Sequence, residues 1–167
     1  MRGKTIYCCF FLIFVTTAAR ADSFFEFFEP VRPSRPFQVM VHRGAMHQAP
    51  ENTQAAMEHV INDGFEWAEV DVRLSADGDH VLWHDETLAV PGAGLTALDS
   101  LSTAQLLALD VGIRFAPRFA GERILRLQEA LEISRHRLNL YLDCKKVNPK
   151  KLAEEIVSVG MAGQVVV

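Results

Sequence analysis

Residues 37–74 read FQVMVHRGAMHQAPENTQAAMEHVINDGFEWAEVDVRL and contain one complete strand, helix, strand pattern. Apolar residues alternate with other residues over 37–41 and over 65–74, which predicts two β-strands. The segment between them predicts a helix over 53–62, and Gly64 follows it as a typical helix end. A helix that connects two strands is typical of the crossover between parallel strands. This stretch therefore favours a parallel α/β fold.

The rest of the chain continues the alternation of strands and helices. Further strands are predicted at 80–84, at 139–144 and from 165 onward, and further helices at 102–109, 125–135 and 149–159. A closed (β/α)₈ TIM barrel takes about 250 residues, so a chain of 167 residues supplies only its N-terminal part, with about five strands. The chain ends on three valines, which favours a longer protein, a truncated gene product or a subunit that needs a partner.

Two local features leave the pairing of strands open. Asp77-Gly78 is a strong tight-turn signal. A hairpin at this turn would set Asp71 opposite His84, whereas a parallel crossover would bring both residues to one rim of the sheet. Residues 86–97 contain glycines and are expected to form a loop.

The first 36 residues are predicted to precede the folded domain, which spans 37–167. Residues 1–21 have a basic start, an apolar run and an Ala-Arg-Ala cleavage site, as in a secretory signal peptide. Residues 22–36 form a leader rich in proline and phenylalanine. We therefore expect a secreted or periplasmic chain without a stable membrane span, and an uncleaved N-terminal anchor is the alternative.

The charge balance argues against nucleic acid as a partner. Residues 1–21 hold three of the 17 basic residues and none of the 21 acidic residues, so the remainder has a net charge of −7. Such a chain repels a polyanion, and a small anionic substrate would need local cations or a metal. Cys144 is the one cysteine after residue 21, so no intrachain disulfide is expected.

Ionisable residues gather where predicted strands end, which is the edge that carries the site in parallel α/β folds. They are His42, Arg43, Glu69, Asp71, His84, Asp143 and Lys145. Glu69 and Asp71 are two apart on a strand and share one face, where two carboxylates suit a divalent cation such as Mg²⁺ or Ca²⁺. Asp143 would supply a third oxygen. The alternative is a solvated polar face beside Arg73.

The two histidines at strand ends suit general acid/base chemistry. His42 and His84 could move protons to and from the oxygens of a phosphodiester near neutral pH. Arg43 and Lys145 would then contact phosphate oxygens. The alternatives are structural histidines and ordinary surface ion pairs. His80 lies beside the predicted turn and is expected at the surface.

Several motifs in order resemble the glycerophosphodiester phosphodiesterase family. The family pattern of His-Arg-Gly, Pro-Glu-Asn-Thr, Glu-x-Asp-Val, Asp-Gly and His-Asp is matched by VHRGAMHQAPENTQAAM and DGFEWAEVDVRLSADGDHVLWHDETL. LSTAQLLALDVGIRFAPRFAGERI is similar to the insertion that follows His-Asp, here residues 86–123, and LNLYLDCKK is similar to a later strand. The resemblance covers residues 39–145 and is highly specific because so many motifs keep their order.

The resemblance implies a (β/α)₈ barrel that hydrolyses glycerophosphodiesters to sn-glycerol 3-phosphate and an alcohol with a divalent metal cation. It assigns acid/base catalysis to His42 and His84, metal ligation to Glu69, Asp71 and Asp143, and substrate binding to Arg43, Glu51 and Lys145. Asp143 stands where the family usually has glutamate. Ala89-Val90-Pro91 stands where the family usually has Arg-x-Thr after His-Asp, so the substrate contacts that the family makes there are not expected in this chain.

Two other functions remain open at this level. A phospholipase-D-like phosphodiesterase acting on lysophospholipids or sphingolipids also accommodates Asp143. A truncated barrel fragment without activity, which binds a phosphodiester or a partner, would keep the same motifs. The expected partner of the enzyme is a small-molecule phosphodiester substrate, and the sequence leaves the oligomeric state open.

Overall fold

The computed structural model describes residues 37–91 and 94–167, so the predicted signal peptide and leader lie outside the described residues. Its main sheet has five strands, four of them parallel in the order β1-β2-β6-β7. These are β1 (Met40–Val41), β2 (Trp67–Leu74), β6 (Asn139–Cys144) and β7 (Val165–Val166), and antiparallel β3 (His80–Leu82) pairs with the end of β2. The parallel α/β prediction is confirmed, although β1 is shorter than the predicted range 37–41.

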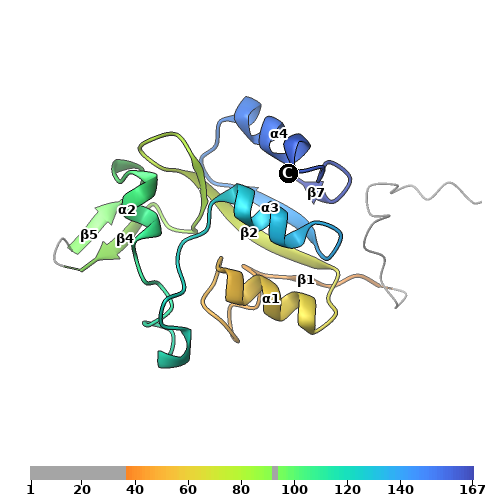
Figure 1. Cartoon of the computed structure of the whole chain (residues 1–167), viewed down its shortest axis with the longest axis horizontal. Helices are drawn as coiled ribbons and strands as arrows, with labels where there is room; N and C mark the ends of the chain where they lie inside the picture. Colours follow the sequence, from red (N-terminus) through yellow and green to blue (C-terminus); the bar gives the residue numbers. More distant parts are fainter. Residues whose placement is uncertain (1–36, 92–93) are drawn as a thin grey trace, which may run out of the picture.

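Three helices cover one face of this sheet, as Figure 1 shows. They are α1 (Gln54–Asn62), α3 (Leu127–Ser134) and α4 (Pro149–Ser158). Their apolar sides pack on strand residues that alternate with the site residues, including Val70 and Val72 of β2 and Leu142 of β6, all fully buried. The opposite face of β2 and β6 therefore carries Glu69, Asp71 and Asp143.

The first strand, helix, strand unit forms as the sequence predicts. Thr53 caps α1 by accepting a hydrogen bond from the backbone N–H of Ala56. Gly64 follows the helix with φ +70°, a conformation that favours glycine. The chain then enters β2, which runs parallel to β1.

The turn at Asp77-Gly78 makes a hairpin between β2 and β3. Gly78 adopts φ +77° at this turn. The register sets Val72 opposite Leu82, and the backbone N–H of Trp83 donates to the carbonyl of Asp71 over 3.0 Å. Asp71 therefore lies opposite Trp83. A hairpin centred between Asp77 and Gly78 would instead have placed Asp71 opposite His84, one residue later in the chain.

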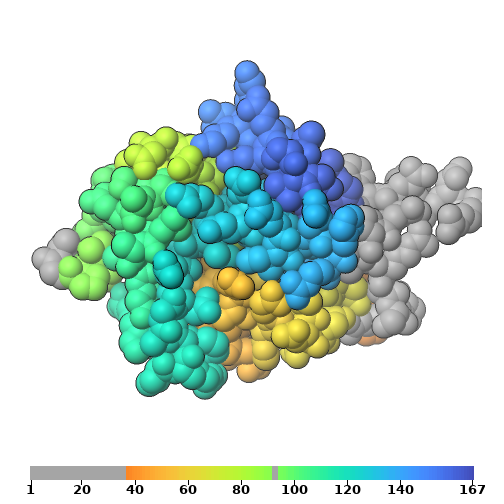
Figure 2. All heavy atoms as spheres, viewed as in Figure 1, coloured from red at the N-terminus to blue at the C-terminus, as the bar shows by residue number. Residues whose placement is uncertain are grey.

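The segment after His84 folds as a small second unit beside the main sheet, shown in green at one end of the molecule in Figures 1 and 2. Strands β4 (Thr87–Val90) and β5 (Gly94–Ala97) form an antiparallel pair, and helix α2 (Thr103–Leu107) follows. Short 3₁₀ helices span Leu98–Ser100 and Pro117–Phe119. Leu88, Leu98 and Leu106 build a separate core with Val81 and Ile124.

The expectation of a loop over residues 86–97 was wrong. Leu88 on β4 packs into the small core, while Gly94, with φ +73°, begins the returning strand. Gly94 therefore belongs to a hairpin strand and not to an irregular loop.

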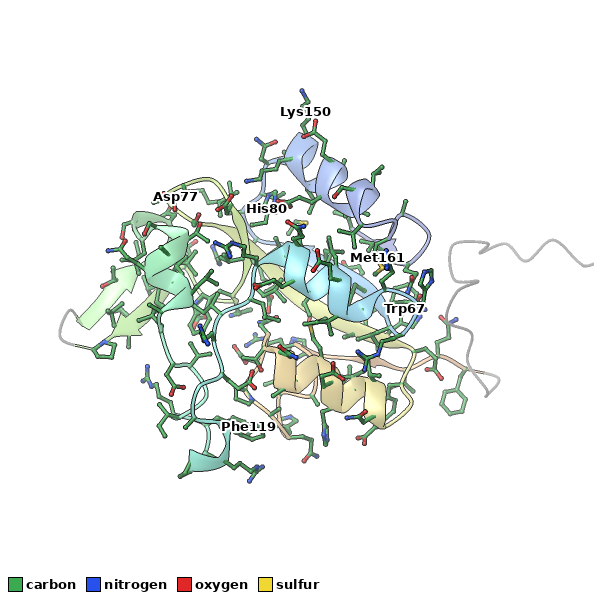
Figure 3. All side chains as sticks on the ribbon, viewed as in Figure 1. Trp67, Asp77, His80, Phe119, Lys150 and Met161 are labelled. Carbon is green, nitrogen blue, oxygen red and sulfur yellow. The ribbon has the colours of Figure 1, made fainter. Side chains whose placement is uncertain are left out.

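His80 is buried, which contradicts its expected surface position. Its relative exposure is 1%, and Figure 3 shows it beside the start of α4. Nδ1 lies 2.6 Å from Glu155 Oε2, and Nε2 accepts the backbone N–H of Asn148 over 3.0 Å. Because Glu155 is 75 residues away in the chain, local sequence around the turn could not reveal this contact.

His80→Ala should lower the free energy of unfolding by about 2–4 kcal/mol, because it leaves a cavity in place of a buried side chain and removes the partner of both Glu155 and the Asn148 backbone N–H. Urea unfolding followed by circular dichroism measures this change. His59→Ala serves as the control, since His59 lies on the outer side of α1 with a 41% exposed side chain. Equal effects of the two substitutions would show that the His80 contacts do not hold α4 to β3.

No helix in residues 37–91 and 94–167 is long and apolar enough to cross a membrane.

Candidate active site

Three carboxylates meet at the carboxyl ends of β2 and β6. Glu69, Asp71 and Asp143 each offer an oxygen, and these oxygens lie within 4.8 Å of one another. The parallel register pairs Asp71 directly with Asp143. Glu69 and Asp71 are buried, with relative exposures of 8% and 1%. The alternative of a solvated polar face is therefore inconsistent with the structure.

The electrostatics of the cluster favour a bound cation. Burial raises the pKa of Glu69, the backbone N–H of Arg43 opposes this by a 2.8 Å hydrogen bond, and Asp71 and Asp143 raise it further by repulsion. Oδ1 of Asp71 is buried and makes no hydrogen bond with the described residues. Three carboxylate oxygens suit a hard divalent cation, so the residues fit a Mg²⁺ or Ca²⁺ site.

Asn52 holds Asp71 in place, a role that the sequence did not reveal. Its Nδ2 donates to Asp71 Oδ2 over 2.9 Å, and its Oδ1 accepts the backbone N–H of Asp71 over 3.0 Å. Asn52 is buried and adopts φ +58°, a left-handed conformation that asparagine tolerates. The only local signal was its place in the Pro-Glu-Asn-Thr motif.

Asn52→Ala is expected to lower the free energy of unfolding by about 2–3 kcal/mol, because both hydrogen bonds are lost and alanine is strained at positive φ. Asn52→Gly loses the same bonds without the strain and should be about 1 kcal/mol less destabilising. Thermal unfolding of both variants separates the two contributions. An alanine variant as stable as the wild type would contradict the assigned role.

Arg43 reaches the same cluster from the loop after β1. Its Nη1 lies 3.0 Å and 3.2 Å from the two carboxylate oxygens of Glu51, and its Nε lies 3.6 Å from Asp71 Oδ2. Burial opposes its charge, but Glu51 and Asp71 outweigh burial, and the pKa of Arg43 is raised. Gly44 must follow it, because a Cβ there would lie 2.9 Å from Cβ of Ala56 at φ +62°.

Lys145 approaches the cluster from the end of β6. Its Nζ donates to Asp143 Oδ2 over 2.6 Å and lies 3.4 Å from Asp71 Oδ1. These contacts, led by the hydrogen bond to Asp143, raise the pKa of Lys145. Arg43 and Lys145 thus place two positive charges beside the carboxylates, an arrangement that can hold a phosphate next to a metal.

The two candidate histidines occupy different surroundings. His42 is exposed, and its Nε2 lies 3.7 Å from Glu69 Oε2. Nδ1 of His84 lies 2.6 Å from Asp85 Oδ1, and its backbone carbonyl accepts a hydrogen bond from Nε of Arg73. Asp85 therefore orients the ring of His84 and leaves its Nε2 for other partners.

The match to a family model covers the site residues and most of the fold. Residues 42–165 match the model of the glycerophosphoryl diester phosphodiesterase family. The chain belongs to this family. The recognition made from the motifs is confirmed, and so is the prediction of part of a (β/α)₈ barrel.

Curated members of the family match over part of their length. A glycerophosphodiester phosphodiesterase of Caldanaerobacter subterraneus subsp. tengcongensis is 39% identical over 95 residues, which cover 57% of this chain and 39% of the relative. Glycerophosphodiester phosphodiesterase 1 of Mus musculus is 36% identical over 130 residues, covering 71% of this chain and 39% of the relative. The family member described here thus spans about two fifths of the length of these relatives.

Solved structures of family members share its fold. The glycerophosphodiester phosphodiesterase of Agrobacterium tumefaciens aligns with a TM-score of 0.72 at 36% identity, over 77% of this chain and 55% of that structure. An Oleispira antarctica phosphodiesterase in complex with the product sn-glycerol-3-phosphate aligns with a TM-score of 0.62 at 34% identity, over 76% of this chain and 51% of that structure.

Proposed function

We propose that this chain contains the catalytic metal site of a phosphodiesterase that hydrolyses glycerophosphodiesters to sn-glycerol 3-phosphate and an alcohol. The observation that carries the proposal is the cluster of three carboxylates, which lies beside the positively charged side chains of Arg43 and Lys145. Family membership supports the reaction class. The product bound by the related phosphodiesterase supports the glycerol 3-phosphate half of the substrate.

Glu69, Asp71 and Asp143 would hold a divalent cation, Mg²⁺ or Ca²⁺. When bound, such a cation polarises a phosphoryl oxygen and stabilises negative charge as the phosphorus–oxygen bond breaks. Asn52 supports this role indirectly, since its two hydrogen bonds fix the Asp71 carboxylate. Residues that orient metal ligands typically affect metal affinity by about 10- to 100-fold.

The side chains around the carboxylates take the remaining roles. We assign binding of phosphate oxygens to Arg43 and Lys145, which both contact Asp71. Glu51 acts as a positioning residue, because its carboxylate holds the guanidinium of Arg43.

Proton transfer is assigned to the two histidines. His42 lies beside the metal ligand Glu69, and the ring of His84 is oriented by Asp85. One histidine removes a proton from the attacking water, and the other protonates the departing alcohol oxygen.

The test of this function is hydrolysis of glycerophosphocholine by the purified chain with added Mg²⁺ or Ca²⁺. We expect release of sn-glycerol 3-phosphate, which glycerol-3-phosphate dehydrogenase detects, and loss of the activity in excess EDTA. A chain that unfolds cooperatively but releases no product with any divalent cation would favour a binding fragment without activity.

The domain limits and the location of the protein remain predictions from the sequence. We propose cleavage after residue 21, export to the periplasm or the medium, and a phosphodiesterase domain that begins at residue 37. N-terminal sequencing of the exported chain should begin at Asp22. Retention of the whole chain in the cell would contradict the signal peptide.

A further inference from the structure

A large apolar cleft lies beside the proposed metal site. Its volume is about 710 Å³, and it separates the residue 46–51 loop from the insertion. Apolar side chains dominate its lining, among them Met46, Trp83, Leu88, Val90, Leu109 and Phe115. This volume is in the range of about 300–1,000 Å³ that is typical of sites for small organic ligands.

The cleft opens from the site through two shared residues. Glu51 lines the cleft and holds Arg43, which in turn contacts the metal ligand Asp71. Trp83 also lines the cleft, while its backbone N–H donates to the Asp71 carbonyl. A group attached to a phosphate between Arg43 and the carboxylates therefore has the cleft as its neighbour.

Two of the polar side chains around the cleft, Asp110 and Trp83, have partners within the protein. The carboxylate of Asp110 accepts backbone N–H groups of Gly112, Ile113 and Gly121. The indole N–H of Trp83 donates to a backbone carbonyl, that of Thr87. Apart from Glu51 and Arg114, which also line the cleft, a polar headgroup would find few hydrogen-bonding partners there, whereas an apolar group loses no hydrogen bond by entering.

Two large apolar side chains of the lining are left in contact with water. Ile113 is 48% exposed and Phe115 is 39% exposed, on the segment that borders the cleft. Contiguous apolar surface next to a catalytic centre is typical of a ligand-binding groove. The exposure of these residues favours an apolar occupant that covers them.

We propose that the cleft binds the acyl or alkyl chain of a lipid phosphodiester, so that this site acts on substrates in which one of the two alcohols carries a long apolar chain. The hydrolysis of such a substrate rests on the proposed function, whereas binding of its apolar chain in the cleft does not. Two attachments of the apolar chain fit the cleft: on the glycerol, as in a lysophospholipid, or on the departing alcohol, as in a decyl ester of glycerophosphate. Both share the chemistry that the cleft recognises.

Binding without turnover tests the proposal independently of catalysis. The protein, in buffer containing EDTA, is titrated with lysophosphatidylcholines of six, eight and ten acyl carbons, each below its critical micelle concentration. The decyl ester of glycerophosphate and glycerophosphocholine are titrated in parallel. Fluorescence of Trp83 reports occupancy, and the chain's other tryptophan is buried Trp67. We expect affinity to rise by about two- to fourfold per methylene, with no detectable binding of glycerophosphocholine.

A matched pair of variants locates the binding. Ile113→Glu places a charge in the cleft and should weaken binding of the ten-carbon ligands by at least about tenfold. Leu95→Glu is the control, because Leu95 is 76% exposed on β5 and does not line the cleft. It should bind these ligands as the wild type does.

Each outcome decides between the proposals. If the decyl ester binds more tightly than the ten-carbon lysophospholipid, the apolar chain of the substrate is on the departing alcohol. If the lysophospholipid binds more tightly, the apolar chain is on the glycerol. Affinity that is independent of chain length, or equal losses in both variants, would overturn the cleft assignment. So would binding that appears only after residues 22–36 are deleted, because that segment would then be the occupant. Chain-length dependence without hydrolysis would support the cleft and contradict only the catalytic function.

Discussion

His42→Ala should lower kcat for glycerophosphodiester hydrolysis by about 10²–10⁴, the usual contribution of a general acid or base. The reason is the position of the imidazole, whose Nε2 lies 3.7 Å from Glu69 Oε2 and therefore beside the proposed metal. The measurement is the release of sn-glycerol 3-phosphate from glycerophosphocholine under saturating metal. KM should change much less than kcat, because the imidazole acts in the transition state.

Three measurements separate proton transfer from a structural effect of this substitution. His42 has an exposed side chain, so its removal should leave the unfolding temperature nearly unchanged. Added imidazole should partly restore the rate if a missing proton carrier is the cause. His59→Ala serves as the control for histidine loss at an exposed helix position. An unaltered kcat in His42→Ala would contradict the catalytic assignment.

The sequence predicted the parallel strands well because their signals are local. The alternation over β2 placed Glu69 and Asp71 on one face, and the residue range predicted for β6 was the observed one. Strand ends in a parallel sheet meet at one edge, so Asp143 could be assigned to the cluster without knowledge of its distance. The structure brings these three carboxylates together.

The sequence failed where contacts join distant segments. The burial of His80 depends on Glu155 and Asn148, which approach only after α4 has docked. The bonds from Asn52 to Asp71 likewise join a loop to a strand 19 residues later. Neither contact leaves a periodic pattern, so the surface position expected for His80 depended on the neighbouring turn alone, and no role was predicted for Asn52.

The pairing of β2 with β3 shows a third kind of limit. A turn signal predicts a hairpin but does not fix its register to one residue. Asp71 lies opposite Trp83, so Trp83 both pairs with β2, which carries Glu69 and Asp71, and lines the apolar cleft. This link could not be read from the spacing of Asp71 and His84.

Glu69→Gln should separate metal binding from folding, since it removes one charge with little change of shape. In the absence of metal we expect the variant to be as stable as the wild type or slightly more stable. Burial raises the pKa of Glu69, so the folded state disfavours its charge, and a neutral amide avoids this cost. With metal, affinity should fall by at least about 100-fold, more than for residues that only orient ligands.

Thermal unfolding with and without Mg²⁺ or Ca²⁺ measures both effects on one sample. A metal at 100 times its dissociation constant stabilises the wild type by about 2.7 kcal/mol, which raises Tm by roughly 5–10 °C in a domain of this size. At the same concentration the variant should gain at most about 0.4 kcal/mol, which is a shift in Tm of roughly 1–2 °C. Glu132→Gln, on the exposed side of α3, should retain the wild-type shift. An equal metal-induced shift in Glu69→Gln and the wild type would exclude Glu69 as a ligand, even if hydrolysis were lost, because activity alone cannot distinguish a metal ligand from a residue that positions the substrate.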